Sequence, residues 1–243
     1  MNIKKREINL LRSYPKSDRP FEDRGKRKLS GAGYIKLEDS NQNNTDTFFE
    51  QLLLKKAREF GEVYFDGDRL FGYGGYTYNK KYWNGVAKDI INHYQLNSGN
   101  KVLEIGCAKG FLLNDLIENL PGLEVSGIDI SSYAVQNSMA SVRDCIQEGD
   151  ASNLPFKDNE FDLVLSINTL SELEEVKCRR ALREIERVKK GNSFITVNSW
   201  DNEQSKNRFL NWNITAPTNF SKEEWIKIFS EESYSGDFNW FTF

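Results

Sequence analysis

The sequence has few of the residues that build metal sites, disulfide frameworks and membrane spans. His93 is the only histidine, which excludes histidine-rich metal sites and serine–histidine triads that use any other histidine. The cysteines are odd in number and isolated (Cys107, Cys145 and Cys178), so they predict neither a disulfide framework nor a paired-cysteine zinc site. No apolar run is long enough to span a membrane, and the first residues lack the apolar stretch of a secretory signal. We therefore expect a reduced, cytoplasmic protein.

Basic residues are concentrated at the start of the chain. Residues 1–30 hold ten Lys and Arg against four Asp and Glu, a net charge of +6, so the remainder carries −9 to reach the total of −3. Such an arm could bind RNA or an anionic surface, but its few scattered aromatics favour a solvated, mobile leader. We expect three parts: a basic leader and linker over residues 1–47, a helix and aromatic cover over 48–85, and the main domain over 86–243.

From residue 101 onward, short apolar runs alternate with segments of helical periodicity. The runs predict strands at 101–106, 123–130, 144–151, 161–170, 192–200 and 237–243. The periodic segments predict helices at 48–60, 84–96, 111–120, 131–142, 171–191 and 221–232. Gly191 is expected to end the helix that begins at residue 171. This alternation predicts an α/β fold with a doubly wound, mostly parallel sheet, whose ligands bind beyond the carboxyl ends of the strands.

The turn after the strand at 101–106 carries the clearest ligand signal. In "LEIGCAKGF", Gly106 and Gly110 let the chain turn sharply and let a ligand approach the backbone. A nicotinamide-binding turn would have glycine at position 108, where this sequence has alanine, so a dehydrogenase is the weaker alternative. Asp129 and Asp150 follow the next two strands. A carboxylate at the first of these positions can accept hydrogen bonds from both ribose hydroxyls, and one at the second suits the edge of an adenine.

Taken in order, the segments "VLEIGCAKG", "GIDIS", "GDASNLPF" and "FDLVLSINTL" resemble those of class I S-adenosylmethionine-dependent methyltransferases, over about residues 86–200. The resemblance implies a Rossmann-like methyltransferase fold and S-adenosylmethionine as the cofactor. The residues that it places around the cofactor are Glu104, Gly106, Cys107 and Gly110 at the methionine part, Asp129 and Ile130 at the ribose, Asp150 and Ala151 at the adenine, and Asn168 near the sulfonium. Two departures are the alanine at position 108 and the single strand after the last helix, where the family usually closes its sheet with an antiparallel pair.

The segment "YGGYTYNKKYW", residues 73–83, combines aromatic residues with glycines. In the resembled family the chain before the first strand commonly folds over the cofactor, so Tyr73, Gly75 and Tyr76 are expected to contact it as part of a lid. Aromatic rings can stack on adenine and line a sulfonium site, and glycines permit opening and closing. The alternative is an aromatic cluster that only packs the N-terminal helices on the sheet. The segment is also similar to that of bacterial methyltransferases associated with surface-polysaccharide and nucleotide-sugar pathways.

Three residues are candidates for a general base. Glu172 and Asp201 follow the fourth and fifth strands, and His93 lies on a helix before the motif turn. The residues "INTLSE" after the fourth strand lack the Asn/Asp-Pro-Pro-aromatic turn of amino-methylating nucleic-acid enzymes and the Pro-Cys of cytosine enzymes, so nucleic acid is disfavoured. The resemblance then implies methylation of a small molecule, a sugar or a nucleotide-linked intermediate of capsule or polysaccharide biosynthesis. The alternatives are methylation of RNA or protein, or a cofactor-binding subunit without catalysis. No resident metal is expected, and a homodimer stays open.

Overall fold

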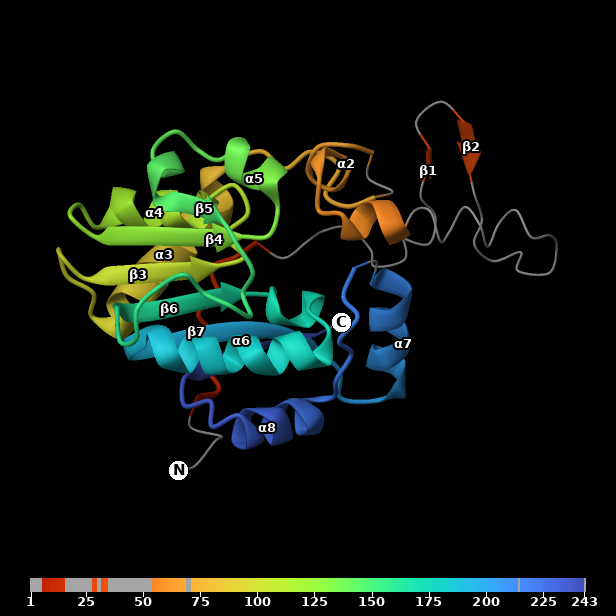
Figure 1. Ribbon diagram of the computed structural model, residues 1–243. Helices are drawn as coiled ribbons and strands as arrows, with labels where there is room; N and C mark the ends of the chain where they lie inside the picture. Colours follow the sequence, from red (N-terminus) through yellow and green to blue (C-terminus); the bar gives the residue numbers. More distant parts are fainter. Residues whose placement is uncertain are drawn as a thin grey trace.

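Six strands form a parallel sheet at the centre of the molecule (Figure 1). This computed structural model describes residues 6–15, 28–29, 32–34, 54–68, 71–213 and 215–242. The strands of the sheet are β3 (Lys101–Ile105), β4 (Glu124–Asp129), β5 (Ile146–Glu148), β6 (Phe161–Ile167), β7 (Lys189–Ser199) and β8 (Asp237–Thr242). Their order is β5-β4-β3-β6-β7-β8, and every pairing is parallel. The doubly wound fold is confirmed, and β8 joins the sheet in parallel as the strand after the last described helix.

Each face of the sheet has its own hydrophobic core, because side chains alternate along a strand. Val102 of β3 belongs to one core and its neighbour Leu103 to the other. The first core packs against α3 (Lys80–Tyr94), α4 (Phe111–Asn119) and α5 (Ser132–Gln136). The second packs against α6 (Glu175–Val188) and α8 (Lys222–Glu231). Figure 1 shows these two helical layers with the sheet between them, which leaves the two ends of the strands as the places where a site can form.

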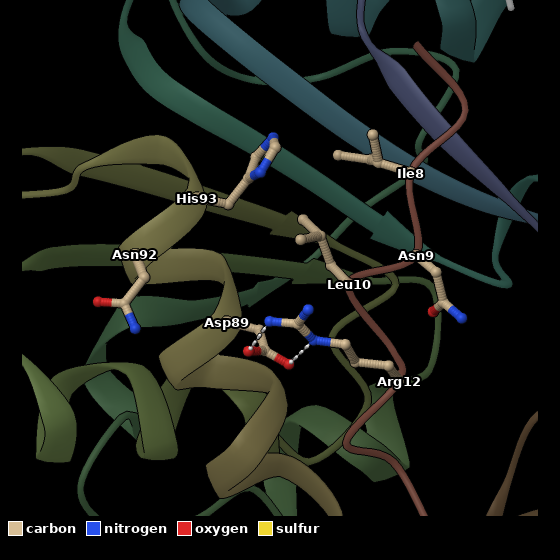
Figure 2. Close-up of a pocket in the computed structure, with 7 residues that line it drawn as sticks. All are labelled: Ile8, Asn9, Leu10, Arg12, Asp89, Asn92 and His93. Atoms are coloured by element: carbon tan, nitrogen blue, oxygen red, sulfur yellow. Dashed lines mark hydrogen bonds and ion pairs between the residues drawn. The ribbon is translucent and has the colours of Figure 1, made fainter. Parts of the chain in front are cut away.

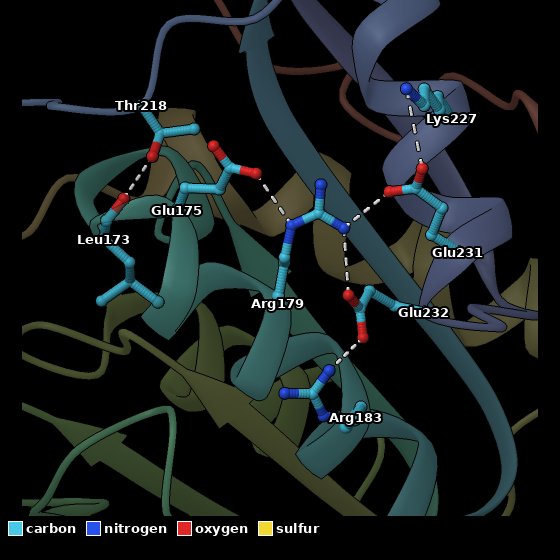
Figure 3. Close-up of polar contacts among 8 residues, drawn as sticks. All are labelled: Leu173, Glu175, Arg179, Arg183, Thr218, Lys227, Glu231 and Glu232. Carbon is cyan, nitrogen blue, oxygen red and sulfur yellow. Dashed lines mark hydrogen bonds and ion pairs between the residues drawn. The ribbon is translucent and has the colours of Figure 1, made fainter.

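Charged side chains join α6 to α8 on the second face (Figure 3). Arg179 of α6 contacts Glu231 at 2.8 Å and Glu232 at 3.0 Å, and it also contacts Glu175 one turn earlier at 2.9 Å. Arg183 pairs with the second carboxylate oxygen of Glu232. A carboxylate shared by two guanidinium groups forms a network, which holds elements together better than isolated surface pairs do. The network therefore fixes α8 against α6 and with it the chain between β7 and β8.

Gly191 does not end a helix, so this sequence prediction was wrong. α6 ends at Val188, and β7 begins at the next residue and contains Gly191. A Cβ atom at this position would lie 2.5 Å from the carbonyl oxygen of Asp162 in β6, and the β6–β7 register shifts close by. The glycine thus allows two strand backbones to approach closely, and periodicity alone does not distinguish that role from a helix stop.

Other helix boundaries are set by capping side chains rather than by periodicity. α3 begins at Lys80 instead of residue 84, because the side chain of Asn79 accepts a hydrogen bond from the N–H of Lys81. α6 begins only after a 3₁₀ turn, η4 (Leu170–Glu172). α7 (Glu203–Trp212) was not expected, and it starts at a capping box formed by Asn202 and Ser205. A further 3₁₀ turn, η3 (Arg143–Cys145), precedes β5.

The described part of the basic leader is docked on the domain rather than free. The N–H of Ile8 donates to the carbonyl of Phe238 in β8 at 2.9 Å, and Arg12 pairs with Asp89 of α3 at 2.8 Å. Further along, β1 (Lys28–Leu29) and β2 (Ala32–Tyr34) form an antiparallel pair. Residues 54–58 are helical, while residues 48–53 of the helix expected there lie outside the described residues. The division at residues 47 and 85 stays a prediction, and its second boundary falls within α3.

Two segments lie beyond the carboxyl ends of the strands (Figure 1). α2 (Glu62–Phe65) lies beside β4 and α5, and α7 lies beyond β6 and β7. None of the helices in the described part of the chain is long and apolar enough to cross a membrane. The carboxyl edge of the sheet, framed by these two segments, is where parallel sheets bind ligands and where we look for the site.

Candidate functional site

The turn after β3 requires glycine at two positions. Gly106 has φ +75°, and its N–H donates to the carbonyl of Ile128 at 2.7 Å. A Cβ atom at this position would lie 2.0 Å from Oγ1 of Thr169, which follows β6. Gly110 also has φ +75° and is the N-terminal cap of α4. Only glycine combines this left-handed conformation with so little room, so the turn requires both glycines that the sequence motif contains.

Asp129 closes this turn from the end of β4. Its Oδ2 accepts a hydrogen bond from the N–H of Ala108 at 2.7 Å, and its Oδ1 accepts one from the N–H of Ser131 at 2.9 Å. The side chain is 9% exposed; burial raises the pKa of Asp129, and the two backbone N–H groups act against that rise. Each carboxylate oxygen can accept a second hydrogen bond. Asp129 therefore both shapes the turn and keeps acceptor capacity for a ligand hydroxyl.

Glu104, the last polar residue of β3, is buried without a full set of partners. It is 4% exposed, and its Oε2 has no hydrogen-bond partner among the described residues. Burial first, and the nearby carboxylate of Asp129 second, raise the pKa of Glu104 well above its usual value. A buried carboxyl without a partner costs stability, so it is retained where a ligand supplies what the protein does not. A cationic group is the natural partner for the Glu104–Asp129 pair.

The remaining residues expected at the cofactor differ in what they offer. Ile130 follows Asp129 and is 56% exposed, an unusual exposure for an apolar side chain beside a turn. Cys107 belongs to the core on the α3–α4 side, so only its backbone reaches the edge; burial raises the pKa of its thiol well above the usual value. Ala151 is buried in the opposite core after β5. Ile130 is thus the apolar surface that the edge offers to a planar ring.

Asp150 lies after β5 and is already engaged. Its Oδ1 accepts hydrogen bonds from the N–H and the hydroxyl of Ser152, and its Oδ2 pairs with Lys177 at 2.7 Å. Partial burial opposes ionisation, but Lys177 and Ser152 together lower the pKa of Asp150. The side chain shapes the loop after β5, and it is therefore a weaker candidate for direct ligand contact than Asp129.

Asn168 is held at the end of β6 by Thr196 of β7. Its N–H donates to the carbonyl of Thr196 at 3.0 Å and to the hydroxyl at 2.9 Å, and that hydroxyl donates to Oδ1 of Asn168 at 2.7 Å. Asn168 has φ +56°, a conformation that asparagine tolerates better than most residues. Because the Thr196 hydroxyl gives its only proton to Oδ1, the amide nitrogen is the part of Asn168 that can face a ligand, as a donor.

The aromatic segment lies against the motif turn and the start of α4. The ring of Tyr76 stacks on Phe111, the first residue of α4, with centroids 4.7 Å apart and planes at 21°. The ring centroids of Tyr73 and Tyr76 lie 4.4 Å apart, and Tyr73 is 44% exposed. Gly75 has φ +103° and no atom within 4 Å of where a Cβ would be. Tyr76 is thus brought to the motif turn, Tyr73 packs on Tyr76, and Gly75 lies in the bend between them.

The three candidate bases lie in different places. Glu172 is in η4, directly after β6, and is half-buried. Asp201 follows β7 but is exposed, and it pairs with Lys222 at 2.7 Å. His93 lies near the end of α3, 3.7 Å from Asp237, the first residue of β8. The structure therefore brings Glu172 and Asp201 to the carboxyl edge and leaves His93 at the opposite end of the strands.

His93 instead lines a cavity of about 460 Å³ between α3 and the leader (Figure 2). Its other walls are Ile8, Asn9, Leu10, Arg12, Asp89 and Asn92. Arg12 and Asp89 face each other in a bidentate pair, so the charges of this wall are already matched. Within the described ranges, no three His, Cys, Asp or Glu side chains converge as a metal site would require.

Sequence reasoning missed two residues that organise the edge. Thr196 is buried within β7 and orients Asn168, and nothing in the strand pattern distinguishes it from other core positions. Lys109 is buried inside the motif turn and binds the aromatic segment through Asp66. A lysine between a small residue and the last glycine of the motif was visible in the sequence, and lysine is almost never fully buried unless it is paired.

Comparison with known proteins places this edge in a family context. Residues 103–197 match the family model of the methyltransferase domain. A sterol 24-C-methyltransferase of Schizosaccharomyces pombe is 25% identical over 217 residues, which cover 79% of this chain and 56% of that protein. An O-methyltransferase of Aspergillus sclerotiorum is 28% identical over 119 residues, 46% of this chain and 44% of that protein. Probable tRNA methyltransferase 9B of Mus musculus is 30% identical over 125 residues, 50% of this chain and 26% of that protein. The chain spans about half the length of these relatives, or less.

Solved structures share the fold. The YcgJ protein of Bacillus subtilis is 22% identical with a TM-score of 0.51, covering 60% of this chain and 66% of that one. A chain of the complex that contains the Haloferax volcanii Trm112 methyltransferase activator is 23% identical with a TM-score of 0.52, covering 79% and 77%. Residues 103–197 therefore resemble a methyltransferase domain, and the chain shares the Rossmann-like fold of these structures. These relatives do not support the expected similarity to polysaccharide-associated enzymes.

The residues at the edge fit an adenosyl cofactor. The glycines at positions 106 and 110 keep the turn tight, and Asp129 keeps acceptor capacity for ribose hydroxyls. The unpartnered Oε2 of Glu104 suits the ammonium group of a methionine moiety, and exposed Ile130 suits one face of an adenine. An adenosyl ligand would supply the hydrogen-bond partners that these carboxyl groups lack and would cover the exposed apolar side chain.

Proposed function

We propose that this protein transfers a methyl group from S-adenosylmethionine to a hydroxyl of a small-molecule acceptor. The observation that carries the proposal is the Glu104–Asp129 pair, two buried carboxyls at adjacent strand ends around a turn that only glycine can make. The methyltransferase domain match over residues 103–197 supports the same reaction class. The chain spans only part of the length of its named relatives. We therefore use their substrates to choose acceptors for the assay and do not assign a substrate from them.

The residues of the turn would hold the cofactor. Asp129 would accept hydrogen bonds from the ribose hydroxyls, Glu104 would face the methionine ammonium group, and Ile130 would lie against the adenine. When bound, S-adenosylmethionine supplies a methyl group on a sulfonium, which makes it an electrophile toward oxygen, nitrogen or carbon. Tyr76 and Phe111 would exclude water from this end, since in-line transfer depends on alignment and on a dry site.

The acceptor would lie between the ends of β6 and β7, on the side of α7. Asn168 would donate a hydrogen bond from its amide nitrogen and so fix the acceptor beside the transferred group. A hydroxyl nucleophile needs a base, and Glu172 is the candidate whose position, directly after β6 and half-buried, suits that role. Its carboxylate would take the proton from the acceptor hydroxyl as the oxygen–methyl bond forms and the sulfur–methyl bond breaks, leaving a neutral thioether. Asp201 is turned to solvent and paired with Lys222, so we place it outside the proton transfer.

A second candidate function is methylation of RNA with the help of a partner protein. It is favoured by the similarity to probable tRNA methyltransferase 9B, at 30% identity over half of this chain. The basic leader would then add contacts to phosphates. A subunit that binds the cofactor without catalysis remains a third outcome of the same experiment.

The test is transfer of a tritiated methyl group from S-adenosylmethionine. The acceptors are a panel of nucleotide sugars, phenols, a malonyl thioester, a sterol and unmodified tRNA, each assayed with the wild-type chain and with Asp129→Asn. We expect label in one small-molecule acceptor, and less label in the variant at the same concentration of S-adenosylmethionine. Label in tRNA alone would replace the small-molecule proposal by the second candidate. Saturable cofactor binding without transfer to any acceptor would favour the non-catalytic subunit, and absence of cofactor binding would overturn the proposal.

A further inference from the structure

Lys109 is the residue of the motif turn whose position the cofactor contacts do not explain. Its side chain is 8% exposed although it carries a charge, and it points away from solvent into the space under the aromatic segment. Its Nζ donates to Oδ2 of Asp66 at 2.6 Å and to the carbonyl of Tyr76 at 2.9 Å. The same ammonium lies 5.7 Å from the centre of the Tyr133 ring. A lysine in the turn thus holds a segment that precedes it by more than thirty residues in the chain.

Asp66 completes this arrangement from the residue after α2. Its Oδ2 accepts hydrogen bonds from Lys109 and from the hydroxyl of Tyr133 at 2.7 Å, and its Oδ1 accepts one from the N–H of Tyr76 at 2.9 Å. Partial burial acts to raise the pKa of Asp66, but these partners outweigh it and keep that pKa below its usual value. Asp66 therefore joins three elements: the motif turn, the aromatic segment and α5.

The consequence falls on Tyr76. Its N–H is bound by Asp66 and its carbonyl by Lys109, so both backbone polar groups are held by one ion pair. With the backbone held in this way, the ring lies stacked on Phe111, directly after the turn. The aromatic segment is therefore bonded to the same turn that would bind the cofactor, in addition to packing on the hydrophobic surface around it.

We propose that Lys109 is a positioning residue for cofactor binding: through Asp66 and the carbonyl of Tyr76 it holds the aromatic segment closed over the adenosyl site. This inference rests on the proposed function, since it names the part of the chain that retains the cofactor. An ion pair with one partner almost fully buried responds strongly to loss of either member, because the remaining charge is left without compensation. Opening the cover thus requires Asp66 and Lys109 to separate, which links the movement of the segment to this pair.

The experiment measures the rates at which S-adenosylhomocysteine binds to and leaves the full chain, by stopped flow. In Lys109→Met we expect the dissociation rate to rise by about tenfold or more, with association unchanged or faster, because the cover opens more easily. Asp66→Asn should raise it by a similar factor. The double variant should be no worse than Lys109→Met alone, since both changes break one interaction. Tyr133→Phe, which removes a single hydrogen bond to Asp66, should have the same direction and a smaller effect.

A matched control separates positioning from general stability. Lys189, whose side chain is 10% exposed, and Glu186 form an ion pair of 2.6 Å at the amino end of β7, away from the motif turn and the aromatic segment. Lys189→Met should leave the dissociation rate unchanged. An unchanged rate in Lys109→Met, or additive losses in the double variant, would overturn the inference while leaving the proposed function intact. A wild-type chain that does not bind S-adenosylhomocysteine would overturn the proposed function instead. If Lys109→Met does not fold, Asp66→Asn and Tyr133→Phe decide the question by the same rates.

Discussion

The two halves of the carboxyl edge use their polar residues in opposite ways. On the β3–β4 half, Glu104 and Asp129 are buried, and Asp129 binds only backbone N–H groups. On the β6–β7 half, Asp201 is exposed and its charge is matched by Lys222. Burying a carboxyl costs free energy, so the first half bears a cost that only a constant ligand justifies. The second half leaves Asp201 in solvent and Glu172 only half-buried, so it bears less of this cost.

This contrast teaches where a shared function and a specific one are encoded. The cofactor half depends on backbone geometry, because the glycines at positions 106 and 110 have no substitute. The β6–β7 half depends on side chains that follow the strands, on a 3₁₀ turn and on α7. Changes in the first half should therefore weaken or abolish cofactor binding, and changes in the second should spare it.

The largest effect is expected from Gly106→Ala. The alanine would take up an unfavourable φ and its Cβ would collide with Thr169, at a cost of about 2–5 kcal/mol in unfolding free energy. Binding of S-adenosylhomocysteine, measured by calorimetry, should disappear. Gly99→Ala is the matched control, because Gly99 has φ +84° but no atom within 4 Å of the added Cβ. It should cost about 1–2 kcal/mol and leave binding unchanged. Equal behaviour of the two variants would contradict the role of the turn.

The next largest effect is expected on the transfer rate, from a change in the β6–β7 half. Glu172→Gln keeps the size of the side chain and removes its basicity, so the transfer rate should fall by about a hundredfold or more. Affinity for S-adenosylhomocysteine should stay the same, because the cofactor half is untouched. Asp201→Asn and His93→Gln should leave both quantities near those of the wild type. A full transfer rate in Glu172→Gln, measured with the labelled methyl group, would remove Glu172 as the base.

Asp129→Asn is expected to weaken cofactor binding without abolishing it. The amide cannot accept hydrogen bonds at both ends, so the turn and the ribose compete for one acceptor. We expect a loss of about 1–3 kcal/mol, or roughly five- to 150-fold in Kd. Asp150→Asn, a change of the same kind after β5, should have a smaller effect because Asp150 is partly exposed and paired with Lys177. Equal losses in the two variants, measured by calorimetry, would argue against the assignment of the ribose to Asp129.

The smallest effect concerns stability and pH. The folded state raises the pKa of Glu104, so folding favours the protonated carboxyl. The stabilisation from the protonated Glu104 carboxyl is present below its pKa in the unfolded chain, about 4.3, and is lost as pH rises through its pKa in the folded chain. Glu104→Gln has no carboxyl to ionise, so it avoids this loss of unfolding free energy at high pH. The variant should therefore be more stable than the wild type at pH 8, by about 1 kcal/mol in urea unfolding, although it binds the cofactor less well.

Comparing Glu104→Gln with the wild type across pH isolates the effect of this carboxyl from that of the other acids at the edge. The difference in unfolding free energy between Glu104→Gln and the wild type should shrink toward pH 4. A difference that is constant across pH, or a less stable variant at pH 8, would mean that Glu104 has a partner in the folded chain. Such a result would also remove the argument that a cationic ligand completes the site.

The same two halves differ in how far they could be predicted from sequence. Alternating apolar runs predicted all six strands of the sheet, and the spacing of Glu104, Gly106 and Asp129 predicted their meeting at one edge. These predictions succeed because strands and tight turns follow local sequence patterns. α7 was missed, because its start depends on a capping box rather than an apolar stripe, and Gly191 was misread as a helix stop.

The contacts of the cover needed the structure itself. The sequence predicted that Tyr73 and Tyr76 lie over the turn, but not that Lys109 and Asp66 fasten them. The two charges are far apart in the chain, and no periodicity links them. The alternative reading, an aromatic cluster that only packs the N-terminal helices, is compatible with the stacking of Tyr76 on Phe111. The ion pair between Lys109 and Asp66 favours the lid interpretation, because it connects the aromatic segment to the turn that would bind the cofactor.

The account is tested most directly by amide hydrogen exchange of the full chain with and without S-adenosylhomocysteine. It predicts that bound ligand slows exchange at residues 104–111, at 129–131 and in the cover at 73–78, while residues 203–212 and the α3 end near His93 change little. Protection confined to the β6–β7 half or to the cavity at the leader would contradict it. No protection at a ligand concentration that saturates binding would contradict it as well.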